Sequence, residues 1–252
     1  MSPVMLFYKD VQVLSRDEHR DLRLKGSEGF DFAANTHWLP VAGTEFASAC
    51  RSYPIVFVSE GSGADEKITA ILLVGLQQGS NDYVDNEKHW HPGAYLPAFV
   101  RRYPFALAVP GPNDEGGKGD FMVCFDASFA GFNMEEGAHI FNEDGTASEL
   151  LEGVVEFMNG FQNDLAETKK FVDELRRLDL LERRSAEVRG SNGRLFKVDD
   201  ILVVNEKKFN ELSDAEVGKL HRQHYMGWIY AHLMSLSNLP LLVDLHRGKK
   251  GE

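Results

Sequence analysis

Histidine, tryptophan, arginine and tyrosine recur together in two segments of the chain, and these are the side chains that could do chemistry. The first segment, residues 37–58, reads HWLPVAGTEFASACRSYPIVFV, and the second, residues 89–109, reads HWHPGAYLPAFVRRYPFALAV. Both begin with His-Trp-x-Pro, pass through an arginine and end on Tyr-Pro with a short apolar run. The His and the Tyr are 16 positions apart in the first copy and 14 in the second, so a two-residue insertion aligns them.

These residue types could build one ligand pocket if the two copies face each other. Paired histidines could exchange protons with a ligand, and an arginine beside a tyrosine could bind a carboxylate. The residues of this candidate pocket are His37, Trp38, Tyr53, His89, Trp90, His91, Arg102 and Tyr103. The structural interpretation, which we favour, is that each tryptophan packs and each histidine caps a turn beside the proline. Each tyrosine hydroxyl and each arginine then pairs with a nearby acid inside the sheet layer.

A second group of histidines lies on a predicted helix over residues 214–237. At 100° per residue, His221, His224 and His232 fall on one face, and the first two are one turn apart. His221 and His224 are therefore weak candidates for a metal site. No H-E-x-x-H motif is present and no carboxylate stands at ligand spacing, so we expect no metal here and a buried, hydrogen-bonded His232.

Other reaction signatures are absent from the sequence. It contains no G-x-S-x-G, no G-x-x-x-x-G-K-[ST], no G-x-G-x-x-G and no C-x-x-C. The loop GPNDEGGKGD has glycines and a lysine, but it lacks the order of a phosphate-binding loop and is expected to join two strands. We therefore expect no cofactor, and the question of catalysis stays open with the balance toward a non-catalytic protein.

Each copy of the duplicated segment predicts the same set of elements. A short helix ends before Tyr-Pro because proline disfavours helical geometry at the residue before it. An apolar strand, a polar turn and a second strand follow, and so short a connection makes the pair antiparallel. The predicted repeat covers about residues 37–76 and 89–126. The two units are expected to pack together and bury a common apolar face.

Two helices are expected to cover these units. Apolar residues at i, i+3 and i+4 spacing predict a long helix over 147–180, which Gly160 either kinks or divides. The T-x-x-E spacing from Thr146 to Glu149 indicates a capping box at its start. The helix over 214–237 is apolar nearly all round from Trp228 to Leu236 and should lie in the centre, with Asn238 and Pro240 ending it.

Between the two helices, Asn192-Gly193 predicts a β-hairpin. The predicted fold is α+β: two repeated antiparallel β units with short helices, packed against a long helix and a buried C-terminal helix. We expect one domain over 1–245 and a disordered tail over 246–252.

Composition excludes some classes of partner. The 252 residues carry a formal net charge of −12, which disfavours nucleic acids because their binding depends on clustered lysine and arginine. No window approaches 18 consecutive apolar residues, so no transmembrane segment is expected. The first 20 residues lack the basic and apolar regions of a secretory signal, which predicts a cytoplasmic protein.

Several longer phrases resemble one bacterial family. The phrases LFYKDVQVLSRDEHRDLRL, YPIVFV, GAYLPAFVRRYPFALA and IYAHLMSLSNLPLL are similar to the SapC family, and the similarity spans nearly the whole chain. The family is named from a surface-layer gene cluster, and the resemblance implies a role in surface-layer, cell-envelope or uptake systems. It implies no catalytic residues.

Three functions remain as hypotheses, and the weakest of them is a metal protein that uses His221 and His224. The first is a non-catalytic binding or accessory protein whose partner is a protein or a small ligand. The alternative is an enzyme or small-ligand binder that uses the duplicated His-Trp and Arg-Tyr-Pro segments. The sequence leaves the oligomeric state and the identity of the partner open.

Overall fold

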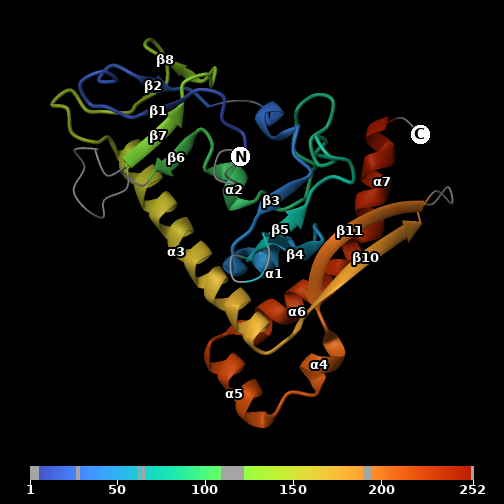
Figure 1. Ribbon diagram of the computed structural model, residues 1–252. Coiled ribbons are helices and arrows are strands. Elements are labelled where there is room, and N and C mark those ends of the chain that lie inside the picture. Colours follow the sequence, from blue (N-terminus) through green and yellow to red (C-terminus); the bar gives the residue numbers. More distant parts are fainter. Residues whose placement is uncertain are drawn as a thin grey trace.

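Helices and antiparallel sheets are combined in this protein as the sequence predicts, and the fold is α+β (Figure 1). The structure is a computed structural model. It describes residues 6–26, 29–61, 63, 66–108, 122–189 and 195–250.

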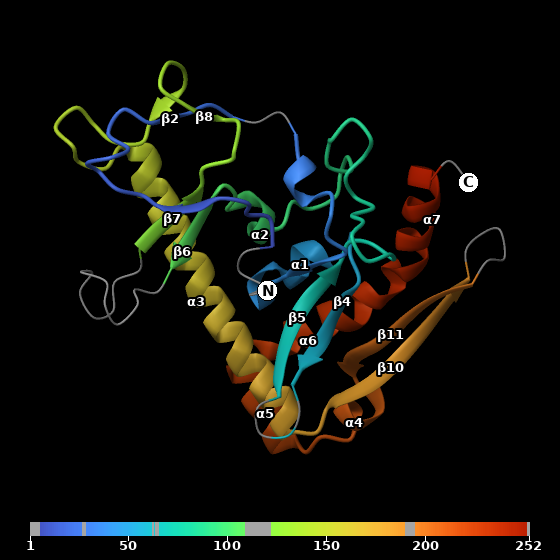
Figure 2. The same cartoon turned by 45° about the horizontal axis from the view of Figure 1, so that its top comes forward.

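The largest sheet has five antiparallel strands in the order β10-β11-β4-β5-β3. Its strands are β3 (Trp38–Pro40), β4 (Ile55–Glu60), β5 (Lys67–Leu73), β10 (Leu181–Arg189) and β11 (Leu195–Val204). The β10–β11 hairpin is predicted by the sequence, although the Asn192-Gly193 turn lies outside the described residues. Figure 2 shows the hairpin extending from one side of the sheet, while β5, which is followed only by the short strand β3 in the strand order, lies next to α3 (Glu149–Arg177).

Two smaller sheets lie near the N-terminal end of α3. One has the order β1-β7-β6 and the other β8-β2-β9. Their strands are β1 (Val11–Val13), β2 (Arg23–Leu24), β6 (Phe105–Ala108), β7 (Met122–Asp126), β8 (Phe132–Asn133) and β9 (Ala138–His139). The GPNDEGGKGD loop between β6 and β7 lies outside the described residues.

The two copies of the duplicated segment have the same order of elements. Helix α1 (Phe46–Ala49) precedes the β4–β5 hairpin, and α2 (Ala98–Arg101) precedes the β6–β7 hairpin. Both hairpins are antiparallel, but they belong to different sheets. That the segments are a true duplication stays a prediction.

Helix α3 is a single 29-residue helix that joins the two halves of the core. Ser148 is its N-cap and accepts a hydrogen bond from the backbone N–H of Leu151, so the capping box predicted at Thr146 is wrong by two positions. The helix continues through Gly160 without a division. Its first turns pack with the aromatic cluster around Phe125, and its last turns pack against the main core through Phe171 and neighbouring residues.

The predicted continuous helix over 214–237 is wrong. His224 has φ of 62°, and this left-handed conformation divides the segment into α5 (Asp214–Arg222) and α6 (Tyr225–Ser235). Ser213 and Glu216 form a capping box at the start of α5. Helix α6 packs against α1, β4 and β11, yet Tyr230 and Met234 are 51% and 66% exposed, so only one face of α6 is buried.

The chain continues as a helix where the sequence predicts a stop and a disordered tail. A 3-10 turn at Leu236–Asn238 leads into α7 (Leu239–Lys250), because a proline is tolerated in the first turn, where its missing N–H is not needed. The imidazole of His246 is buried and lies 3.0 Å from the carboxylate of Asp82. This pair attaches α7 to the loop after β5.

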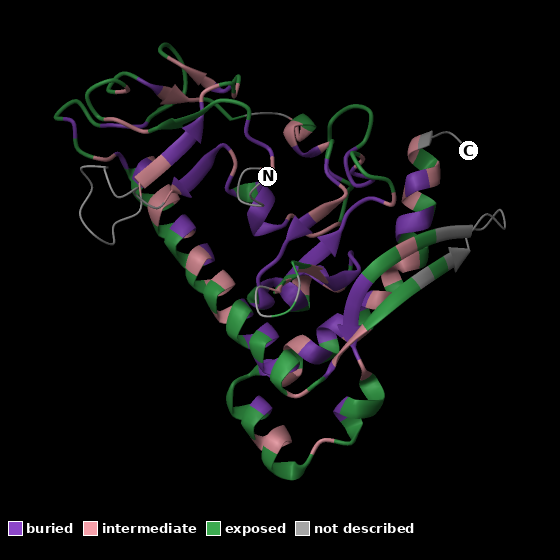
Figure 3. Ribbon diagram, in the orientation of Figure 1, coloured by how far each residue is buried: buried purple, intermediate pink, exposed green. Residues whose placement is uncertain are grey.

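Burial is concentrated where the five-stranded sheet meets α3 and α6. Figure 3 shows buried residues along β4 and β5 and mostly exposed residues on α4 (Glu206–Asn210) and α5. No helix among the described residues has both the length and the apolar composition needed to span a bilayer.

Two side chains of α6 link this helix to the sheet. The Nδ1 of His232 lies 2.9 Å from the carbonyl oxygen of Ile55 in β4, and its Nε2 accepts the N–H of Val204 in β11 at 3.0 Å. Ser235 accepts the N–H of Ile55 at 2.9 Å. With one nitrogen donating and the other accepting, His232 is held in one neutral tautomer. The predicted buried, hydrogen-bonded His232 is confirmed.

His232 should make stability depend on pH. Burial lowers its pKa from 6.5 to about 4, so the unfolded chain binds a proton at a pH where the fold does not. The stabilisation is complete above pH 6.5 and is lost as the pH falls toward 4, by about 3 kcal/mol at 1.36 kcal/mol per pKa unit. Urea unfolding between pH 7.5 and 4.5 measures this, and in His232→Gln the slope over this window should be smaller.

Gly43 is required by the close approach of α6 to the start of α1. A Cβ built at Gly43 would lie 2.4 Å from the ring of Trp228. Gly43→Ala should therefore destabilise the fold by roughly 1–3 kcal/mol, as overpacking does. Gly160→Ala is the matched control, because a Cβ on this exposed helical position meets nothing within 4 Å and should stabilise α3 by roughly 0.5–1 kcal/mol. Equal melting temperatures for the two variants would contradict the close packing of Trp228 against Gly43.

Candidate functional site

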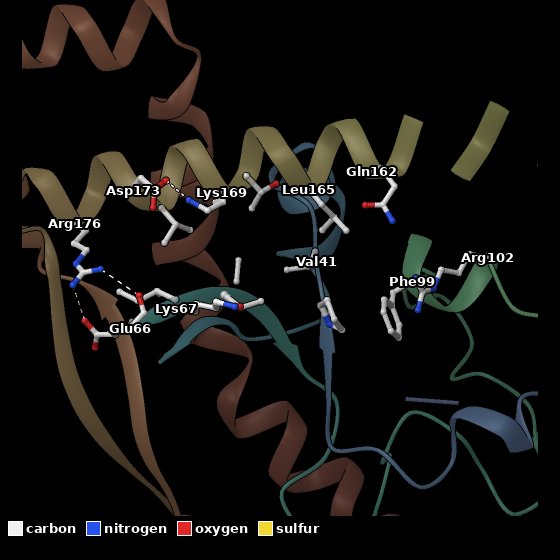
Figure 4. Close-up of a pocket in the computed structure, with 16 residues that line it drawn as sticks. Val41, Glu66, Lys67, Phe99, Arg102, Gln162, Leu165, Lys169, Asp173 and Arg176 are labelled. Carbon is white, nitrogen blue, oxygen red and sulfur yellow. Dashed lines mark hydrogen bonds and ion pairs between the residues drawn. The ribbon is translucent and has the colours of Figure 1, made fainter. Parts of the chain in front are cut away.

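A groove of about 500 Å³ lies between α3 and the edge of the five-stranded sheet (Figure 4). One wall is the part of α3 from Gln162 to Arg176. The other wall is formed by β5 and the residues that follow β3. A volume of this size is typical of ligand sites in proteins.

The middle of the groove is apolar. Leu165 and Val172 come from α3, where their spacing of seven residues places them on the same face two turns apart. Val41 and Ala70 come from the opposite wall. Ligand sites are commonly lined in this way, with few polar groups that fix orientation.

Charged side chains lie at the end of the groove near the start of β5. Arg176 forms an ion pair with Glu66 at 3.1 Å, and Lys169 forms one with Asp173 at 2.6 Å. Lys67 also lines this end, and its side chain forms no ion pair with any described residue. The two carboxylates are thus neutralised, and Lys67 leaves an excess positive charge.

Arg102 and Phe99 of the second copy form the opposite end (Figure 4). The guanidinium carbon of Arg102 lies 3.9 Å from the centroid of the Phe99 ring, which is a cation–π contact. The residue is only 3% exposed, and burial lowers the pKa of its guanidinium below the ordinary value. Of the eight residues of the predicted pocket, Arg102 is the one that lines this groove.

The two copies do meet, but at Tyr53 and Trp90. The indole N–H of Trp90 donates to the hydroxyl of Tyr53 at 2.9 Å, and that hydroxyl donates to the carbonyl of Tyr95. Both side chains are buried, and burial raises the pKa of Tyr53 above its ordinary value. Trp90 is thus packed in the core, and the hydroxyl of Tyr53 pairs with Trp90 and Tyr95 and not with an acid.

A buried carboxylate forms a second contact between the two copies of the duplicated segment. Glu45, just before α1, accepts the N–H of Ala98 at the start of α2 at 2.7 Å and the hydroxyl of Tyr95 at 3.1 Å. Burial raises the pKa of Glu45, although these hydrogen bonds act in the opposite direction. Glu45 therefore fixes the end of α2 that presents Phe99 to the groove.

Tyr103 lies in an aromatic cluster away from Tyr53. Its ring stacks on Phe32 with centroids 4.0 Å apart, and its hydroxyl donates to Asp126 at 3.1 Å. Burial raises the pKa of Asp126, but hydrogen bonds from Ser128 and from the N–H groups of Asp10 and Lys9 outweigh it and leave the pKa below its ordinary value. Asp126 thus stays ionised and holds the N-terminal segment against β7.

The histidines of the candidate pocket lie in different environments. His89 and His91 are exposed, and the Nδ1 of His89 lies 3.7 Å from the carboxylates of Asp85 and Glu87. His37 and Trp38 are half-buried, and burial lowers the pKa of His37. The proposal of one pocket built on these three histidines stays a prediction.

His221 and His224 are both exposed and lie on either side of the end of α5. The break at His224 removes the continuous helical face on which the metal hypothesis depended. Across the described ranges, no group of three or more His, Cys, Asp or Glu side chains is arranged to hold a metal ion.

Sequence reasoning missed most of the groove. Leu165 and Val172 belong to the apolar face predicted for the long helix, but a sequence pattern does not show which part of such a face stays uncovered. In β5, Lys67 is the one charged residue, and its place at the start of a mostly apolar strand is the signal that could have indicated a site there.

Tyr53→Phe should cost more stability than Tyr103→Phe. The first change leaves the indole N–H of Trp90 and the carbonyl of Tyr95 without their partner, at roughly 1–3 kcal/mol. The second removes one of several donors to Asp126 and should cost about 1 kcal/mol or less. Chemical unfolding of the two variants measures the difference, and a larger loss in Tyr103→Phe would contradict this account.

Comparison with known proteins finds one family. The SapC family profile matches residues 14–242. Searches of the curated proteins and of the solved structures gave no match.

Proposed function

The chain belongs to the SapC family, and from that premise we propose that it is a non-catalytic binding protein, accessory to bacterial surface-layer, cell-envelope or uptake systems. Its binding site is the groove between α3 and β5. The observation that carries the proposal is the groove itself, an apolar channel of about 500 Å³ with charged ends.

The side chains of the groove support binding over catalysis. Its lining, as far as the structure describes it, includes no His, Cys or Ser, which are the common nucleophiles and bases. Its two carboxylates, Glu66 and Asp173, each pair with a cation. Paired carboxylates are poor proton acceptors, whereas an apolar surface between charges is suited to holding a ligand.

A photo-cross-linking amino acid at Thr69 tests whether the groove is occupied in the cell. Thr69 is exposed and lines the groove. Irradiation of the native host should join the protein to a partner at this position. Glu187 is the matched control, because it is exposed on β10 at the opposite edge of the same sheet and should give no adduct.

Adducts of the same size from both positions, or from neither, would overturn the proposal that the groove is the binding site. A second variant, Leu165→Arg, places a charge in the middle of the groove. It should abolish the adduct at Thr69 while the melting temperature stays near that of the parent, since Leu165 is only partly buried.

A further inference from the structure

We propose that the groove binds a peptide in extended conformation, which adds as a strand to the outer edge of β5. This inference rests on the proposed function, because it names the ligand class of the same site. The recognition would combine main-chain hydrogen bonds with an apolar wall and a positive charge.

The direction of the backbone groups in β5 shows that part of its edge is open. The carbonyl of Ala70 accepts the N–H of Val41, and the N–H of Val74 donates to His37, so these even-numbered residues face the β3 side. The N–H of Leu73 donates to Pro54 on the β4 side. Because successive residues of a strand alternate, the N–H and the carbonyl of Ile68 also point to the β3 side.

No strand within the described part of the chain pairs with Ile68 on that side. The register between β3 and β5 ends with Pro40 opposite Ile71. An unpaired donor and acceptor on a strand edge are a template for another strand.

The open part of the edge has defined ends. On one side, the guanidinium of Arg176 donates to the carbonyl of Glu66 at 3.3 Å. On the other side, the N–H of Val41 donates to the carbonyl of Ala70 at 3.2 Å. Ile68 lies between these closed positions, so an incoming strand would form one pair of hydrogen bonds with it.

The dimensions suit a short extended segment. The lining of α3 runs from Gln162 to Arg176, which is about 21 Å of helix at 1.5 Å per residue. Six residues of an extended chain cover about 20 Å at 3.3 Å per residue. Alternate side chains of such a segment would face Leu165 and Val172.

The charge of the groove indicates an acidic segment. Among the described residues that line it, four side chains are cationic and two are anionic, although the whole chain has a net charge of −12. The cations are Lys67, Arg102, Lys169 and Arg176, and the anions are Glu66 and Asp173. Lys67 lies beside Ile68 in the sequence. An acidic side chain of the peptide, near the residue that pairs with Ile68, could therefore form an ion pair with Lys67.

A displayed library of random octapeptides, selected on the purified full-length chain, tests the proposal. Selected peptides should combine apolar residues with Asp or Glu. Their binding is then measured by fluorescence anisotropy of the labelled synthetic peptides. Lys67→Glu should weaken these peptides about tenfold or more, as the loss of a charged contact and its replacement by repulsion would do.

Two changes separate strand addition from simple apolar binding. Ile68→Pro removes the outward N–H without removing a bond to β4, and should weaken binding about tenfold compared with Ile68→Ala. If the proline variant does not fold, N-methylation of the peptide backbone tests the same bonds on the unchanged protein. At one backbone position this modification should reduce affinity about tenfold. Full affinity of every N-methylated peptide would overturn strand addition.

The test also distinguishes this inference from the proposed function. Decanoate, a medium-chain fatty acid, is the probe for a lipid-like ligand. The peptide proposal is overturned if decanoate raises the melting temperature of the parent but not of Leu165→Arg, and if no selected peptide binds more weakly to Lys67→Glu. A lipid-like ligand then takes the place of the peptide. The binding function then stands. Absence of an adduct at Thr69 in the host would instead overturn the binding function itself.

Discussion

A single straight helix has to cover two sheets, and the rest of the structure depends on this constraint. The 29 residues of α3 extend over about 43 Å. Its first half covers the aromatic cluster near β6 and β7, and its second half covers the main core. The helix contacts β5 and β6, which belong to different sheets. The groove lies where α3 and the edge of β5 diverge.

The duplicated segments serve mainly to hold this arrangement. Glu45 from the first copy fixes the start of α2 in the second, and Trp90 from the second donates to Tyr53 in the first. Both contacts are buried, and a buried polar group without its partner is costly. The segments therefore fix the position of α2, and with it the Phe99 and Arg102 end of the groove.

Local sequence patterns predicted the helices and strands better than they predicted the contacts between them. The strand over Ile55–Glu60 follows from its apolar residues and from Pro54 before it, and the long helix follows from apolar spacing, so both were accessible from the sequence. The break at His224 was not, because a left-handed histidine leaves no mark in a helical pattern. The groove was inaccessible for another reason. It depends on where α3 crosses β5, and residues about 100 positions apart in the sequence determine that crossing.

The short open edge at Ile68 has a consequence for the behaviour of the protein in a crowded cell. Long unpaired strand edges promote edge-to-edge pairing between strands of different molecules. Here Arg176 occupies one neighbouring carbonyl and Val41 the other, and α3 lies over the gap between them. A sheet from a second molecule would collide with α3 before its strands could align. The open edge at Ile68 is thus short, which limits edge-to-edge pairing with a second molecule.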